Sequence, residues 1–102
     1  MSSIKQDALV FGAGVVFEKF IQSGDAKPYD IVALLDNNKT GEFLDYPVIK
    51  PDAKLLQDTE YDLVILTLWD KPEVIEAVSQ QLIAFGVPAE KIKVYSLSLI
   101  HI

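Results

Sequence analysis

The stretch at residues 8–17, ALVFGAGVVF, constrains the fold more than any other part of the chain. Its first four residues are apolar and predict a strand at residues 8–11 that is buried on both faces. The strand stops at Gly12-Ala13-Gly14, and an apolar stripe then predicts a helix over residues 15–23. Because glycine has no Cβ, a phosphate group could approach the backbone of this turn closely. The turn is therefore a candidate binding site.

A second apolar run, DIVALL at residues 30–35, predicts another strand after this helix. Strand–helix–strand crossovers are nearly always right-handed, so the two strands should be parallel neighbours. Residues 36–41 are turn formers that must leave the sheet. Further elements are expected as an irregular extended piece or small hairpin at 42–49, a short helix at 51–57, and strands within 61–68 and at 92–95.

The last third of the chain carries one more helix signal and an alternating tail. Asp70 and Glu73 have the spacing of a capping box, which predicts a helix from there to Gly86. Residues 96–102, SLSLIHI, alternate between apolar and polar side chains, as an exposed or partner-covered strand would. Strands that alternate with helices favour the α/β class: a three-layer, Rossmann-like open sheet, mainly parallel, with helices on both faces.

The length of 102 residues allows one domain over residues 1–102, either complete or as a fragment or subunit of a larger protein. Nine Lys and Arg stand against fifteen Asp and Glu, a net charge of -6, which argues against a nucleic-acid partner. There is no cysteine and His101 is the single histidine, so neither a zinc site nor a Cys/His nucleophile can be assembled within one chain. No apolar run approaches a membrane span, and a cytoplasmic protein is expected.

The candidate ligand site lies where the strand order of such a sheet reverses, at the carboxyl ends of the strands. An acid about 20 residues after a Gly-x-Gly turn can receive ribose hydroxyls, and Asp36 has this spacing. Residues 67–72 should form the opposite wall of the crevice. The predicted binding residues are Gly12, Ala13, Gly14, Val15, Asp36, Asn37, Thr67 and Trp69.

Several residues argue against a complete dinucleotide motif. Phe17 stands where the third glycine of G-x-G-x-x-G is expected, and its ring should push the helix away or fill the space of the pyrophosphate. Glu18 adds a negative charge that repels phosphate. In the alternative interpretation, the glycines only form a tight turn and Asp36 is an ordinary turn acid. Tyr46 and Lys50 have the spacing of a dehydrogenase catalytic pair, but Pro47 between them argues against the helix that such a pair needs.

The order of motifs resembles a Rossmann-like domain of bacterial sugar-modifying proteins. The motifs that carry the resemblance are VFGAG, LLDNNKTG, YPVIKP, YDLVILTLWDKPEVIEAV and FGVPAEKI. Similar domains occur in nucleotide-sugar acyltransferases, in polysaccharide epimerase/dehydratases and in sugar C-methyltransferases. The resemblance implies that Gly12, Gly14 and Asp36 contact a uridine nucleotide sugar, and that the catalytic parts lie in other domains.

Three hypotheses follow. The first is an accessory module that binds a nucleotide or nucleotide sugar in cell-surface polysaccharide metabolism, as a homo-oligomer or with a catalytic domain. The second is an oxidoreductase or epimerase component that uses NAD at the same turn and takes its acid/base pair from another subunit. The third is an assembly module in which the tail at 96–102 extends a sheet across a dimer. No residue of the chain is assigned a catalytic role, and whether the protein is an enzyme stays open.

Overall fold

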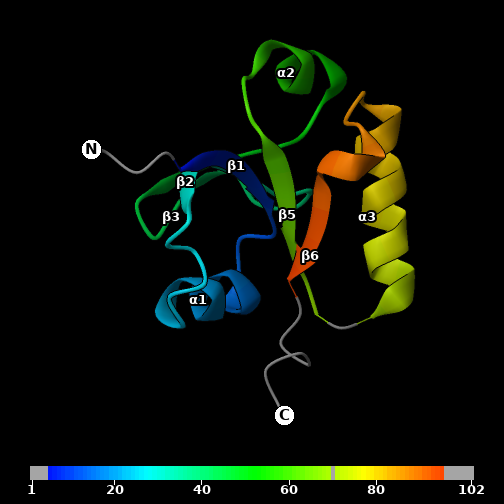
Figure 1. The fold of residues 1–102 in the computed structure, drawn as a ribbon. Coiled ribbons are helices and arrows are strands. Elements are labelled where there is room, and N and C mark those ends of the chain that lie inside the picture. Colours follow the sequence, from blue (N-terminus) through cyan, green and yellow to red (C-terminus); the bar gives the residue numbers. More distant parts are fainter. Residues whose placement is uncertain (1–4, 70, 96–102) are drawn as a thin grey trace.

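The structure is a computed structural model that describes residues 5–69 and 71–95 (Figure 1). Its helices are α1 (Val15–Gln22), α2 (Ala53–Asp58) and α3 (Pro72–Ala84), and a short 3₁₀ turn covers Ala89–Lys91. Its strands are β1 (Gln6–Phe11), β2 (Tyr29–Leu35), β3 (Gly41–Phe43), β4 (Tyr46–Ile49), β5 (Leu63–Thr67) and β6 (Ile92–Tyr95). The predicted strands and helices within these ranges are confirmed, with ends that move by a few residues.

The strands form a six-stranded sheet in the order β3-β4-β2-β1-β5-β6. All neighbours are parallel except β3 and β4, which form an antiparallel hairpin. The expected mixed α/β class with a mainly parallel sheet is thereby confirmed. From β1 the chain continues to β2 on one side, and it later returns to β5 on the other side. The strand order therefore reverses between β1 and β5.

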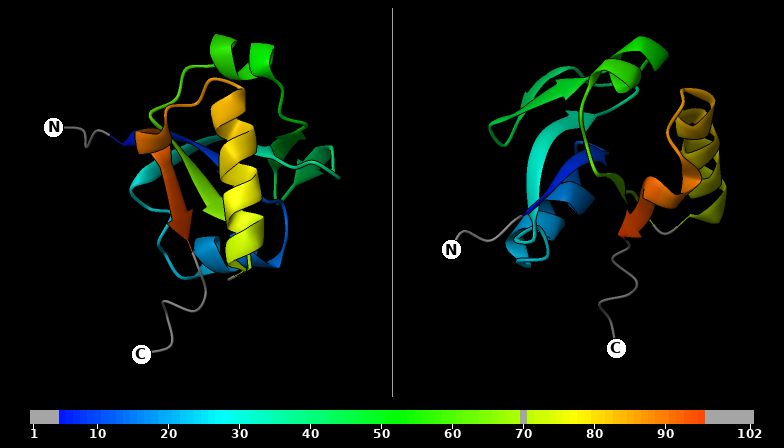
Figure 2. Two further views of the ribbon diagram at one scale, coloured as in Figure 1. Left: turned by 90° about the vertical axis from the view of Figure 1, so that its right-hand side faces the viewer. Right: turned by 45° about the horizontal axis from the view of Figure 1, so that its top comes forward.

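Helices cover both faces of the sheet (Figure 2). Successive side chains of a strand point to opposite faces, so Ala8 and Val10 pack with Phe17 and Phe20 of α1. Leu9 and other side chains of the second face pack under α2 and α3, in the cluster Phe11, Leu35, Leu56, Leu66, Val78, Leu82. Burial on both faces explains why β1 is a continuous apolar run.

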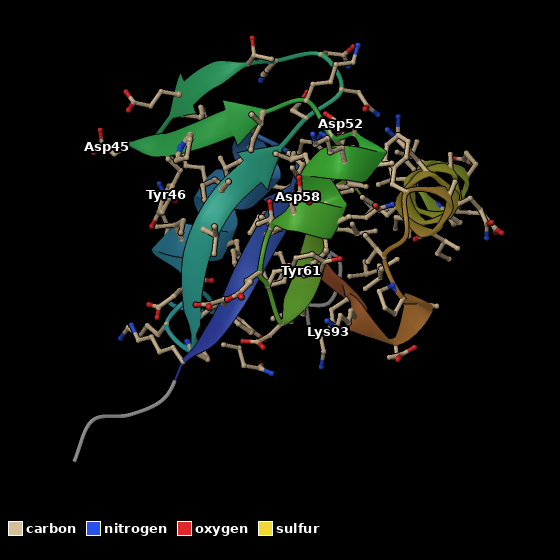
Figure 3. The ribbon with its side chains drawn as sticks, turned by 90° about the horizontal axis from the view of Figure 1, so that it is seen from above. Asp45, Tyr46, Asp52, Asp58, Tyr61 and Lys93 are labelled. Atoms are coloured by element: carbon tan, nitrogen blue, oxygen red, sulfur yellow. The ribbon has the colours of Figure 1, made fainter. Side chains whose placement is uncertain are left out.

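The β3–β4 hairpin extends the sheet beyond β2 and turns at Leu44 and Asp45, which both have positive φ. Figure 3 shows Asp45 and Tyr46 at this edge and Lys93 of β6 on the far side. Because Tyr46 belongs to a strand, it does not share a helix turn with Lys50, and its ring packs 5.7 Å from that of Phe17. The expectation that residues 46–49 are extended and not helical is confirmed.

The start of α3 differs from the predicted capping box. Asp70, the expected cap, lies outside the described residues, and Lys71 is the cap residue without a side-chain capping bond. Pro72 occupies the first helical position, where its fixed φ favours the helix. The lack of an N–H costs nothing there, because an N–H at this position has no acceptor within the helix. The predicted strand at 96–102 and His101 also lie outside the described residues. Over the described ranges, none of the helices has the length and apolarity to cross a bilayer.

Candidate functional site

A cavity of about 280 Å³ opens at the carboxyl ends of β1 and β5, where the strand order reverses. The two βα turns form its walls, from the glycine turn on one side to the segment after β5 on the other. Every predicted binding residue except Asn37 lines it: Gly12, Ala13, Gly14, Val15, Asp36, Thr67 and Trp69. Leu68 and Lys71 also line the cavity, within the wall predicted at residues 67–72, and Val16, Lys39 and Val74 line it without having been predicted.

Gly12 is required by the close approach of β1 to β5. Its φ is +115°, and a Cβ there would lie 2.5 Å from the backbone oxygen of Thr67. The buried hydroxyl of Thr67 contacts the carbonyl oxygens of Phe11 at 3.1 Å and Gly12 at 3.0 Å. Thr67 thus joins the ends of the two strands, and its hydroxyl proton is used within the protein.

Gly14 differs from Gly12 because nothing in its own geometry demands glycine. It is the cap residue of α1, with an extended backbone at φ −160°. A Cβ there would meet nothing nearer than the Lys39 ammonium at 4.0 Å. The backbone N–H groups before Glu18 have no acceptor within α1, because the N–H of Glu18 is the first to bond within the helix, to the Gly14 carbonyl. A side chain at residue 14 would occupy space in front of these amides.

Asp36 links the glycine turn to the loop after β2 by hydrogen bonds. Its Oδ2 accepts a hydrogen bond from the backbone N–H of Ala13 at 3.0 Å. Its Oδ1 accepts from the backbone N–H groups of Asn38 and Lys39 at 2.8 and 3.0 Å. A carboxylate offers about four lone-pair positions, so one position on Oδ2 stays available to a ligand.

Two lysines give the cavity a positive side in a chain of net charge -6. Lys39 donates from Nζ to the Ala13 carbonyl oxygen at 2.8 Å, and Lys71 lies at the amino end of α3. The amino ends of α1 and α3 both face the cavity, and helix amino ends carry a partial positive charge. The arrangement suits an anionic ligand. The net charge of the whole chain gives no sign of this local positive charge.

Phe17 does not fill the cavity, so the expectation that its ring takes the space of the pyrophosphate is wrong. Its side chain is fully buried on the sheet side of α1, and its ring lies 6.2 Å from Phe43 and 6.4 Å from Phe20. Neither Phe17 nor Glu18 lines the cavity. The bulky residue is accommodated because the β3–β4 hairpin supplies an aromatic pocket for it, away from the glycine turn.

Asn37 points out of the candidate site toward α3. Its side-chain amide and that of Gln81 exchange two hydrogen bonds, at 2.9 and 2.8 Å. This pair joins the loop after β2 to the last turn of α3. Its direction was not readable from the sequence, because Gln81 is 44 residues away.

The rim of the cavity is apolar. Val15, Trp69 and Val74 line it with exposed fractions of 52%, 57% and 39%. Large apolar side chains this exposed around a polar floor are typical of ligand or partner contacts. Among residues 5–69 and 71–95, no cluster of three metal-ligating side chains occurs.

The fold and the cavity define a small α/β domain with a glycine turn at the reversal point of a mainly parallel sheet. The chain belongs to the family of C2185-like N-terminal domains, whose model matches residues 4–93. No curated protein matches the sequence.

Solved structures with this fold include three of RSP, described as a Rex-family repressor. The complex of RSP with beta-NAD+ and operator DNA has a TM-score of 0.60, and the complex with beta-NADH has 0.61. The third RSP structure has a TM-score of 0.58. Each is 15% identical and covers 94% of this chain, which spans 52–55% of the RSP chain. At this identity the likeness shows a shared fold, and the chain has about half the length of these proteins.

These comparisons correct the sequence-based assignment. The resemblance to sugar-modifying proteins is wrong, because the matching family is C2185-like and the solved neighbours are a repressor. The expected roles in polysaccharide metabolism and beside a transferase domain are therefore wrong too. The quoted motifs describe strand ends, turns and helix caps, which many nucleotide-binding sheets need for the same physical reasons. They do not distinguish one family from another.

The expected absence of a nucleic-acid partner is also wrong, since a protein of this fold is found on operator DNA. The net charge of -6 belongs to a stretch half as long as that protein, so it sets no limit on a longer chain. The uridine nucleotide sugar gains no support. NAD, the other expected ligand, is the one found with a protein of this fold.

Proposed function

We propose that this domain binds NAD+ or NADH in the crevice between β1 and β5. The observation that carries the proposal is the convergence of the glycine turn, Asp36 and two helix amino ends on one cavity at the reversal point of the sheet. Dinucleotides bind at this point in doubly wound sheets. The bound neighbours support NAD as the ligand, and with it the finer description of residues 1–102 as a single Rossmann-like domain.

The glycine turn fits the pyrophosphate. Gly14 leaves the space before the first amides of α1 open, and these amides have no acceptor within the helix. Oxygen atoms of a phosphate accept hydrogen bonds from such amides, and the helix dipole favours their charge.

Asp36 fits a ribose with free hydroxyl groups. The remaining lone-pair position on its Oδ2 can accept one hydroxyl proton while the three backbone bonds persist. A phosphate on the same ribose would meet this carboxylate with like charge. The domain should therefore prefer NADH to NADPH.

The apolar rim fits a flat ring. Trp69 and Val74 on one side and Val15 on the other are exposed at the mouth of the cavity. An aromatic face can stack on a base or on nicotinamide. Burial of these side chains by the ligand would remove apolar surface from water and stabilise the complex.

The test is a titration of the domain with NADH that is monitored through the fluorescence emission of Trp69, the single tryptophan. NADH should quench this emission, and the affinity for NADPH should be at least tenfold lower. Ligand at 100 times its dissociation constant should add about 2.7 kcal/mol to stability, or several degrees in Tm.

Two variants locate the effect. Gly14→Val can adopt the extended backbone of residue 14 and should fold, but its side chain fills the phosphate path and should abolish binding. Ala84→Val adds a methyl pair at the exposed far end of α3 and is the matched control. Unchanged NADH affinity in Gly14→Val, or neither quenching nor a Tm shift in the parent domain, would refute the proposed site.

A second proposal concerns a role in transcription regulation. The domain covers half of a repressor chain that is found with operator DNA, so we infer that it serves as the nucleotide-binding part of a transcription regulator. The full-length protein should then retain specific fragments from a pool of genomic DNA, with retention that changes between NAD+ and NADH. Retention of no fragment in either state would reject this role.

A further inference from the structure

The ammonium group of Lys39 lies beside the amino end of α1, at the wall of the cavity. Its Nζ lies 2.8 Å from the Ala13 carbonyl oxygen and 4.0 Å from the position of a Cβ on Gly14, the cap residue of α1. The amino end of a helix is its positive end. Lys39 therefore adds a side-chain cation beside the partial positive charge of this helix end.

Contacts at the backbone and at the ammonium group fix the position of Lys39. Its backbone N–H donates to Oδ1 of Asp36 at 3.0 Å, which fixes the loop. Its Nζ, which donates to Ala13, also lies over the ring of Phe43, 5.8 Å from the centroid. The ammonium is thus presented at the cavity, where Lys39 is a lining residue.

The ammonium has capacity beyond its bond to Ala13. A lysine carries three N–H donors, and one of them serves the Ala13 carbonyl. The carboxylate of Asp36 is engaged by three backbone N–H groups. An anion in the cavity would supply acceptors for the remaining donors.

We propose that Lys39 is a direct ligand for the pyrophosphate of the bound dinucleotide. This inference rests on the proposed NAD(H) site and adds a side-chain cation to a contact that backbone amides alone would otherwise make. It also explains how the turn can hold phosphate despite Glu18 in the first turn of α1.

The experiment measures calorimetric affinities of NADH, ADP and adenosine for the domain and for Lys39→Met, Lys39→Arg and Lys27→Met. Lys39→Met should bind NADH and ADP about tenfold more weakly, the size of one charge-assisted hydrogen bond, and should leave adenosine unchanged. Lys39→Arg should recover most of the loss. Lys27→Met removes an exposed lysine that lies outside the cavity and should match the parent domain.

The outcomes separate the two claims. If the parent domain does not bind NADH, the proposed function fails. If the parent binds NADH and Lys39→Met binds it equally well, the function stands and the role of Lys39 is overturned. Equal weakening of NADH, ADP and adenosine would also overturn it, because Lys39 would then act only by supporting the turn through Ala13.

Discussion

At the scale of single residues, the two glycines of the turn have different tasks. Gly12 satisfies a backbone requirement, since its φ is +115° and the Thr67 carbonyl leaves no space for a Cβ. Gly14 has an extended backbone that any residue can adopt, so its lack of a side chain serves the cavity. One glycine protects the fold and the other keeps the candidate site open.

Gly12→Ala should therefore reduce the free energy of unfolding by about 2–4 kcal/mol, from backbone strain and the clash with Thr67. Gly14→Ala should change it by less than about 1 kcal/mol. Urea denaturation of both variants measures the difference. Equal stability of the two variants would contradict the separate roles.

The order of strands and turns in the sequence was enough to predict that five residues share one cavity: Gly12, Gly14, Asp36, Thr67 and Trp69. Parallel strands end at the same edge of a sheet, so residues that follow different strands meet there. The direction of a loop side chain has no such periodic signal. For that reason Lys39 was not selected, and Asn37 was selected although it pairs with Gln81.

At the scale of elements, α1 lies on the sheet through aromatic contacts. The Phe17 ring packs against Phe20, Phe43 and Tyr46, so the hairpin β3–β4 provides part of the surface under α1. The sequence predicted a conflict at Phe17 because it was compared with a glycine motif in isolation. The hairpin that accommodates the ring was itself left open between an irregular piece and a hairpin.

Phe17→Ala should then destabilise the domain by about 3–5 kcal/mol, the usual cost of removing a buried phenyl ring. It should not strengthen NADH binding, because the ring does not line the cavity. Thermal unfolding and the NADH titration, done at a temperature where the variant is folded, measure both effects. A variant that binds NADH more tightly would show that Phe17 obstructs the ligand.

At the scale of the whole molecule, alternating strands and helices were sufficient to predict the α/β class and the mainly parallel sheet. They were not sufficient to predict the family, since the same turns and caps serve many nucleotide-binding sheets. Total charge was also misleading. The chain is acidic as a whole, yet its cavity has two lysines and two helix amino ends.

The central claim is that NAD(H) binds at the reversal point of the sheet, and the most direct measurement is a nitrogen-edited NMR titration of the labelled domain with NADH. The account predicts that the amides of Gly12, Gly14, Val15 and Lys39 and the indole of Trp69 shift together and saturate with one affinity. The amide of Tyr61, two residues before the amino end of β5, should stay unchanged. Shifts centred on Tyr61, or no saturable shift around the glycine turn, would contradict the account.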